Sequence, residues 1–208
     1  TGIIWNTANP YMVESTVAGS PANHVDVDIK KGDVLVAVNG TRVSETANRE
    51  SYLASSVNEP EIKLTFRRGG KEHDVKVHTI SYGALKGLLY NEWEEICRAK
   101  VDKLGNGRIG YTHLKAMGAE DLSSFLKDMH TRMVGKEALI LDLRYNNGGN
   151  VHKEVLDFIS QKAHYTWAFR DNKTNSHPNV TPGDMPIVAL VNERSLSDAE
   201  VTSNGIKT

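Results

Sequence analysis

Hydrophobic positions follow two different patterns along the chain, and the pattern changes near residue 81. The first part holds short runs of β-branched residues that end at turns, which is typical of strands. We expect strands at 12–13, 34–38, 62–66 and 73–80. Asn39-Gly40 is a strong hairpin signal after the second run, and a short helix is expected at about 48–55. The pattern predicts a small antiparallel β-barrel.

Apolar residues between 84 and 104 recur with helical spacing, which predicts an amphipathic helix that ends at Gly105-Asn106-Gly107. Beyond it, apolar strand-like runs alternate with helical patterns. We expect strands at about 108–114, 138–143, 165–170 and 186–191, and helices at about 120–133, at 151–162 and from 197. Such alternation indicates a parallel sheet covered on both faces. The chain thus divides into a β-rich module at 1–80, a linking helix at 81–107 and an α/β domain at 108–208.

Composition narrows the classes of partner. The 208 residues carry a formal charge of −1, which provides no field to gather phosphates, so we expect no nucleic-acid partner. No apolar run approaches the roughly 20 residues of a membrane-spanning helix, so we expect no membrane partner. Cys97 is the only cysteine, which excludes a disulfide framework. We expect neither a metal nor a cofactor.

The two ends of the chain suggest a piece of a longer protein. It begins at Thr1 without an initiator methionine and stops shortly after the helix expected from 197. The ends therefore do not define a compartment, and a cytoplasmic location is only slightly favoured over a periplasmic one.

The first module carries a recognisable motif. Gly19-Ser20-Pro21-Ala22, followed by the segment 29–40, resembles the PDZ domains attached to bacterial and archaeal proteases. In a PDZ domain a peptide adds as an extra strand to an exposed edge, and amides near a glycine-rich loop hold its terminal carboxylate. Gly2-Ile3-Ile4 would be that loop, although it departs from the usual Gly-Leu-Gly-Phe form. Peptide docking and a purely scaffolding role are equal alternatives.

A serine follows the last apolar strand of the second domain. In open α/β sheets, sites form beyond the carboxyl ends of the strands, where helix amino ends gather. Ser197 at such a junction would be exposed beside backbone N–H groups that favour a developing oxyanion. The alternative is that Ser195 or Ser197 only caps the helix, since serine is among the best caps. Taken alone, this segment favours the cap.

Two other strand ends carry residues that could act together with this serine. His113 is the one histidine of eight that lies at a strand end of the expected sheet, and histidine can act as a base for serine. Gly148-Gly149 follows the strand at 138–143, and glycine lets backbone amides approach a ligand closely. An ordinary tight turn, with Asn146 capping the next helix, is the alternative. Asp142 and Arg144 are expected to pair and fix this loop.

In this order and spacing, the segments together resemble the tricorn proteases, relatives of the carboxyl-terminal processing peptidases. The resemblance covers nearly the whole chain: the PDZ-like motif, 90–93, 108–113, 142–149 and Ser197-Asp198. It implies a serine peptidase whose PDZ-like β-barrel precedes a crotonase-like α/β catalytic domain that is truncated at its carboxyl-terminal end. It also implies short peptides as substrates and a homo-oligomer in the full-length protein.

The resemblance also implies roles for single residues. Ser197 would be the nucleophile and His113 the general base. Thr112 would stand where the family has a serine that assists this base through a glutamate, and that glutamate would lie beyond Thr208. The oxyanion donors would be the amide of Asp198 and an amide of the glycine turn. Of the two glycines, Gly148 is favoured over Gly149 as the donor. Asp171 is a separate candidate, which would favour a basic side chain beside the cleaved bond.

Three rival interpretations stay open. A carboxyl-terminal processing peptidase would use a lysine base located beyond this chain. An inactive relative on the same fold would bind peptides or other ligands without cleaving them. A coenzyme-A enzyme of this fold ranks last, because it would not explain the PDZ-like module or Ser197-Asp198.

Overall fold

The structure is a computed structural model that describes residues 1–44, 46–54, 60–168, 170, 175–178 and 180–207. The chain forms two compact units, Thr1–Trp93 and Glu94–Thr208. The division falls within helix α2 (Tyr82–Leu104), which covers most of the linking segment expected at 81–107. No helix in the described part of the chain has the length and apolar character needed to cross a membrane.

The first unit is built from two antiparallel sheets. One pairs β1 (Ile3–Trp5) with β2 (Val13–Thr16), and the other has the order β4-β3-β5-β6. The strands of the larger sheet are β3 (Val34–Val38), β4 (Thr41–Arg42), β5 (Glu61–Arg68) and β6 (Lys71–His78). Helix α1 (Arg49–Leu53) and the 3-10 turn η1 (Pro21–Asn23) complete the unit. Among the described strands, no pairing closes these sheets into a barrel.

Local sequence explains the turns and core of this unit. Asn39 and Gly40 have φ angles of 48° and 82°, the left-handed values that a tight turn between β3 and β4 requires, so the hairpin prediction is confirmed. Alternate residues of β5, including Leu64 and Phe66, are fully buried. The buried carboxylate of Asp33 accepts hydrogen bonds from Arg68 Nε (2.6 Å) and from the backbone N–H of Lys30 (2.9 Å).

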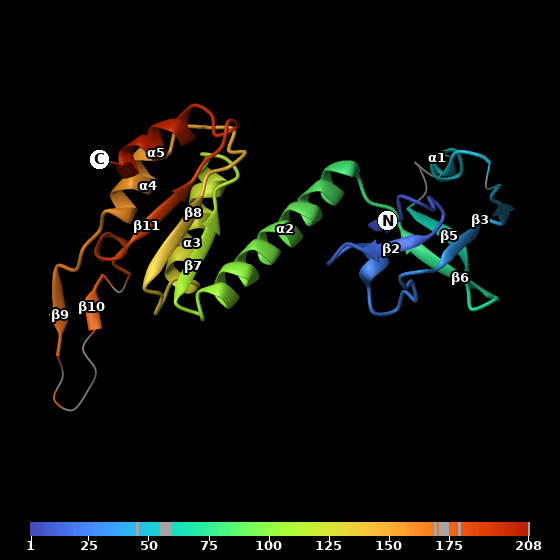
Figure 1. The fold of residues 1–208 in the computed structure, drawn as a ribbon, viewed down its shortest axis with the longest axis horizontal. Helices are drawn as coiled ribbons and strands as arrows, with labels where there is room; N and C mark the ends of the chain where they lie inside the picture. Colours follow the sequence, from blue (N-terminus) through green and yellow to red (C-terminus); the bar gives the residue numbers. More distant parts are fainter. Residues whose placement is uncertain (45, 55–59, 169, 171–174, 179, 208) are drawn as a thin grey trace. The chain divides into compact units, whose positions relative to one another are not determined.

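The second unit contains a parallel sheet of three strands with the order β11-β8-β7 (Figure 1). These strands are β7 (Ile109–His113), β8 (Ala138–Asp142) and β11 (Ile187–Leu190). The register places Asp142 beside His113 on one side and beside Leu190 on the other. The carboxyl ends of all three strands therefore meet at one edge of the sheet.

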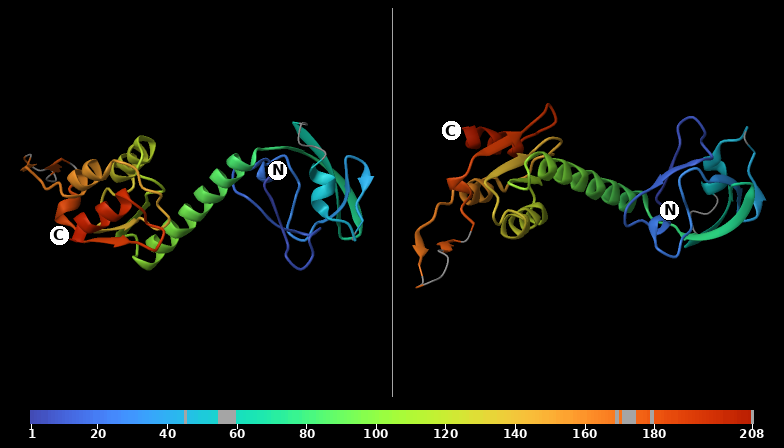
Figure 2. Two further views of the ribbon diagram at one scale, coloured as in Figure 1. Left: turned by 90° about the horizontal axis from the view of Figure 1, so that it is seen from above. Right: turned by 60° about the horizontal axis from the view of Figure 1, so that its bottom comes forward.

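Helices, a 3-10 turn and a projecting hairpin complete the second unit. The helices are α3 (Ala119–Thr131), α4 (His152–Ile159) and α5 (Asp198–Lys207), and Pro182–Asp184 forms a 3-10 turn, η3. Strands β9 (Tyr165–Trp167) and β10 (Asn175–His177) form an antiparallel ribbon that extends away from the sheet in every view (Figures 1 and 2). Val188 of β11 is 55% exposed, so the expectation of a sheet covered on both faces is wrong for this strand among the described residues.

Candidate active site

The site lies where the parallel strands end. The turn after β8 and the turn after β11 are joined directly, because Leu196 N–H donates to the Asn146 carbonyl at 2.9 Å. The turn after β7 is joined to the same place, since Asn146 Nδ2 donates to the Leu114 carbonyl at 2.7 Å. Asn146 is fully buried and thus ties together the three segments that follow the strands.

Ser197 combines a left-handed backbone conformation with an exposed side chain. Its φ angle is 52°, in the left-handed region that a residue with a Cβ rarely adopts. The side chain is exposed, and among the described residues none accepts from or donates to its Oγ. Glu200 Oε2 instead accepts the Ser197 backbone N–H at 2.7 Å, so the glutamate rather than the serine hydroxyl caps this end of α5.

Ser195 has the opposite character. It is only 7% exposed, and its Oγ donates to the Leu143 carbonyl at 2.8 Å and accepts from Asn192 N–H at 3.0 Å. The Ser195 hydroxyl is thus engaged in holding the turn after β11 against β8. Of the two serines that the sequence offers, only Ser197 presents a free hydroxyl.

His113 ends β7 and is held by the backbone of the next strand's turn. It is 9% exposed, and its Nε2 lies 2.9 Å from the carbonyl oxygen of Arg144. A carbonyl only accepts hydrogen bonds, so Nε2 carries a proton in this arrangement. In the neutral ring, Nδ1 is then the basic nitrogen.

Thr112 lies on the other face of the sheet. Neighbouring strand residues point to opposite faces, so the side chains of Thr112 and His113 diverge. The buried Thr112 hydroxyl donates to Asp128 Oδ2 of α3 at 3.3 Å. Asp128 also pairs with Arg98 and Arg132, which makes this contact part of an ion-pair network between α2 and α3.

The glycine turn packs directly on the serine turn. Gly148 has a φ angle of 81°, and a Cβ built on it would lie 2.8 Å from the Cβ of Ser197 and 2.9 Å from the Leu196 carbonyl oxygen. The backbone of Gly149 lies even closer to Met117, where a Cβ would stand 2.0 Å from the carbonyl oxygen. Both glycines are therefore required by close backbone approach.

The backbone N–H groups of these turns differ in availability. Gly148 N–H donates to Asn146 Oδ1 at 2.8 Å, so the donor that the sequence favours is engaged in this conformation. Within the described part of the chain, the N–H groups of Gly149 and Asp198 donate no hydrogen bond. Asp198 is the first residue of α5, where N–H groups lack partners inside the helix.

Asp198 has a second role that sequence reasoning missed. Its carboxylate is almost fully buried, and Oδ2 accepts from the backbone N–H groups of Val151 (2.8 Å) and His152 (2.9 Å). Oδ1 also pairs with the His152 ring. A carboxylate at a helix amino end is stabilising, so Asp198, rather than Asn146, caps α4. No local signal indicates this cap, because the partners lie 46 and 47 residues away.

A buried charge cluster lies beside His113. Asp142 is fully buried, and its oxygens accept from Arg144 Nη2 (2.6 Å) and from the Tyr111 hydroxyl (2.7 Å). Burial alone would raise the pKa of Asp142, but the hydrogen bonds from Arg144 and Tyr111 outweigh it and hold the pKa below its usual value. Burial, with the contribution of Asp142, raises the pKa of Tyr111 far above its ordinary range. The expected pairing of Asp142 with Arg144 is present.

The candidate peptide loop lies in the first unit. Gly2 has a φ angle of 90°, and Ile3 and Ile4 belong to β1. Among the described strands β1 pairs only with β2, which leaves its other edge unpaired. Asp171, the candidate specificity residue, lies outside the described residues. Within the described part of the chain, no group of histidine, cysteine, aspartate or glutamate residues could hold a metal ion.

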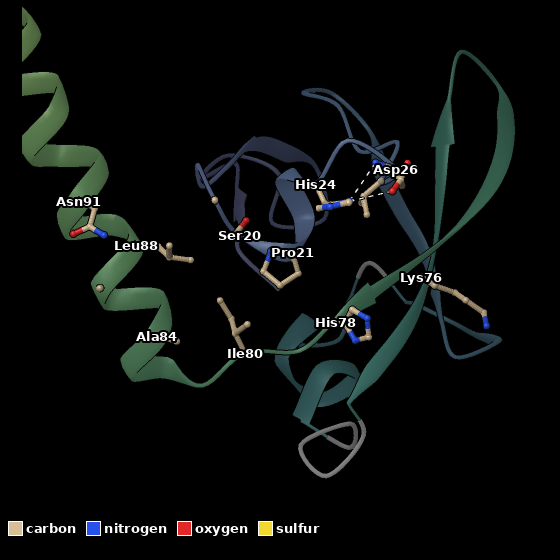
Figure 3. A pocket seen from close by; sticks show the side chains of 13 residues that line it. Ser20, Pro21, His24, Asp26, Lys76, His78, Ile80, Ala84, Leu88 and Asn91 are labelled. Carbon is tan, nitrogen blue, oxygen red and sulfur yellow. Dashed lines mark hydrogen bonds and ion pairs between the residues drawn. The ribbon is translucent and has the colours of Figure 1, made fainter.

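The first unit also has a cavity of about 890 Å³ (Figure 3). Its wall combines the segment around η1 with the end of β6 and the first turns of α2, and Ile80, Leu88 and Pro21 form much of its apolar lining. Gly2, Ile3 and Ile4 do not line it, although Gly2 packs against Ser20 of its wall, since a Cβ built on Gly2 would lie 2.2 Å from the Ser20 side chain.

Comparisons with known proteins agree with this architecture. Residues 108–208 match the family model of peptidase family S41, and residues 6–79 match that of the PDZ domain. The chain is 28% identical over 191 residues to "Tricorn protease homolog 1" of Streptomyces coelicolor, covering 91% of this chain and 18% of that protein. It is 29% identical over 207 residues to "Probable CtpA-like serine protease" of Staphylococcus aureus, covering 94% of this chain and 38% of that protein.

One solved structure extends the comparison to the fold. The crystal structure of the tricorn protease aligns with a TM-score of 0.74 at 22% identity, covering 100% of this chain and 19% of that chain. The chain therefore spans about a fifth of the tricorn proteins that it matches.

Proposed function

We propose that this chain, a member of the tricorn-like protease family, carries the nucleophile and the base of a serine peptidase that cleaves short peptides. Its PDZ domain lies ahead of the family S41 peptidase domain. The observation that carries the proposal is the exposed, unpaired hydroxyl of Ser197 in a left-handed backbone conformation. The proposal also takes the catalytic domain to be crotonase-like and the full-length protein to be a homo-oligomer.

The proposed reaction is acyl transfer. His113 accepts the proton of Ser197 as Oγ attacks the peptide carbonyl, and the free N–H of Asp198 donates to the oxyanion. The C–N bond then breaks, the amine leaves with the proton from His113, and water releases the acyl group from Ser197. A second donor would come from the glycine turn. Gly148 can serve only after its N–H leaves Asn146 Oδ1. The Thr112 hydroxyl donates to Asp128 on the opposite face of the sheet from His113, so the support of the base expected from Thr112 would first require that bond to break.

Labelling of the complete protein by a serine-directed fluorophosphonate tests this proposal. We expect labelling of the wild type, no labelling of Ser197→Ala and retained labelling of Ser195→Ala. Ser195→Ala is the matched control, because it removes a serine hydroxyl from the same turn but one that is buried and hydrogen-bonded. Labelling of Ser197→Ala would exclude Ser197 as the nucleophile.

A carboxyl-terminal processing peptidase with a lysine base is the second candidate. The observation that favours it is the similarity to the CtpA-like relative, which covers nearly the same share of this chain as the tricorn relative does. The pH–rate profile of the complete protein beside that of His113→Ala separates the two candidates. We expect the alanine variant to be inactive, whereas an active variant with an unchanged profile would favour the lysine mechanism.

A further inference from the structure

The buried carboxylate of Asp142 accepts hydrogen bonds from both the backbone and the side chain of Arg144. Its Oδ1 accepts the backbone N–H of Arg144 at 3.0 Å and the Nε of the same residue at 2.9 Å. Its Oδ2 accepts from Arg144 Nη2 and from the Tyr111 hydroxyl. With no exposure to water and all these donors in place, the carboxylate holds both the peptide group and the side chain of Arg144.

The backbone carbonyl of Arg144 faces His113, the candidate base. His113 Nε2 donates to the Arg144 carbonyl oxygen at 2.9 Å, and the β7–β8 register places His113 directly beside Asp142. Asp142 itself is bonded to Arg144 and Tyr111 rather than to the imidazole. Its influence on the ring therefore passes through the backbone of Arg144.

We propose that Asp142 is a positioning residue: by fixing Arg144, it orients the carbonyl that holds the Nε2–H of His113, so that Nδ1 is the nitrogen that takes the proton of Ser197. The last step rests on the proposed function. The hydrogen-bond chain from Asp142 through Arg144 to His113 does not depend on it.

Nitrogen-15 NMR of the 208-residue protein tests the contacts from Asp142 through Arg144 to His113 without any activity measurement. A histidine N–H that is held by a carbonyl exchanges slowly with water and gives a direct N–H cross-peak, which His113→Gln assigns. We expect the cross-peak of His113 Nε2–H in the wild type and its loss in Asp142→Asn. Asp33→Asn is the matched control, because Asp33 is equally buried and paired with an arginine, but lies in the other unit. The cross-peak should persist in that variant.

Arg144→Ala provides a second test in case Asp142→Asn does not fold. It keeps the backbone N–H of residue 144 as a partner for Asp142 but removes the guanidinium, and we expect faster exchange of the His113 proton. A cross-peak that is absent in the wild type, or unchanged in both folded variants, would overturn the proposal. Fluorophosphonate labelling of the same samples reports on Ser197 separately, so failure of the proposed function is distinguishable.

Steady-state kinetics of the complete protein separate a positioning role from a merely structural one, because positioning of the base affects kcat without affecting KM. Misorientation of the base slows proton transfer without removing substrate contacts, so we expect Asp142→Asn to lower kcat at least about tenfold with KM nearly unchanged. An equal loss in Asp33→Asn would show that the effect is general destabilisation, and would count against the positioning role.

Discussion

The backbone of Gly148 lies against Ser197 so closely that a Cβ on the glycine would stand 2.8 Å from the Cβ of the serine. The Leu196 N–H bond to Asn146 holds the two turns at this separation. The glycine turn thus sets the position of the proposed nucleophile as well as offering backbone donors beside it.

Gly148→Ala should impair labelling of Ser197. The variant pays a cost of about 1–2 kcal/mol for a Cβ in the left-handed region, and must also displace the serine turn. Gly135→Ala is the matched control, because Gly135 has a φ angle of 77° but no atom within 4 Å of a built Cβ. We expect a fluorophosphonate labelling rate at least about tenfold lower for Gly148→Ala only. Equal rates in the two variants would contradict the close approach.

Asp198→Ala should destabilise the second unit by about 1–2 kcal/mol, because it removes the cap of α4. Glu154→Ala serves as the comparison. Glu154 is also an acidic residue in the first turn of α4, but it is exposed and caps no N–H, so we expect a loss of only about 0.3 kcal/mol. Urea unfolding of both variants measures the difference. Similar losses would show that general helix electrostatics, rather than the cap, accounts for the effect.

Acid should weaken the second unit partly through Asp142. The pKa of Asp142 is lowered in the folded state, so its contribution to stability is complete above the unfolded pKa of about 3.9 and is lost as the pH falls through the folded value. We expect the urea midpoint to fall below about pH 4, and to fall less steeply in Asp142→Asn. Parallel curves for the two proteins would contradict this assignment.

Peptide docking at β1 should depend on a free carboxylate. If amides of the Gly2-Ile3-Ile4 segment hold the terminal carboxylate, an amidated peptide loses charge-assisted hydrogen bonds and should bind at least about tenfold more weakly. An NMR titration of the chain that follows the amides of Ile3 and Ile4 measures both affinities. Equal affinities would contradict a hold on the terminal carboxylate, and no binding of either peptide would favour the scaffolding role of the first unit.

Strand and helix positions of the second unit follow closely from hydrophobic spacing. The strand expected at 138–143 is β8 (Ala138–Asp142), and the helix expected at 120–133 is α3 (Ala119–Thr131). These agreements arise because periodicity reports which face of a local segment is buried. The exposure of Val188 on β11 was not predictable in this way, because it depends on which other segments of the chain pack on that face of the sheet.

The site was predictable only down to residue types and strand ends. The local pattern alone could not separate Ser195 from Ser197, because both are good caps in one turn, and only the family resemblance favoured Ser197. In the structure, the φ angle and the hydrogen bonds of the two serines differ sharply. The hold of Asp198 on α4 and the contact of His113 with the Arg144 carbonyl join segments that are distant in sequence. Such contacts depend on tertiary packing, which no local pattern encodes.

The long sequence separations within the site affect the order in which it can form during synthesis. Ser195 bonds to a carbonyl 52 residues earlier, and Asn146 to one 32 residues earlier. Within these residues, a ribosome delivers the PDZ unit before the strand that bears the imidazole, and that strand before the Ser197 hydroxyl. Because Ser197 follows β11, which pairs with β8, the proposed reactive centre can form only after the last of the three described strands of this sheet has been synthesised.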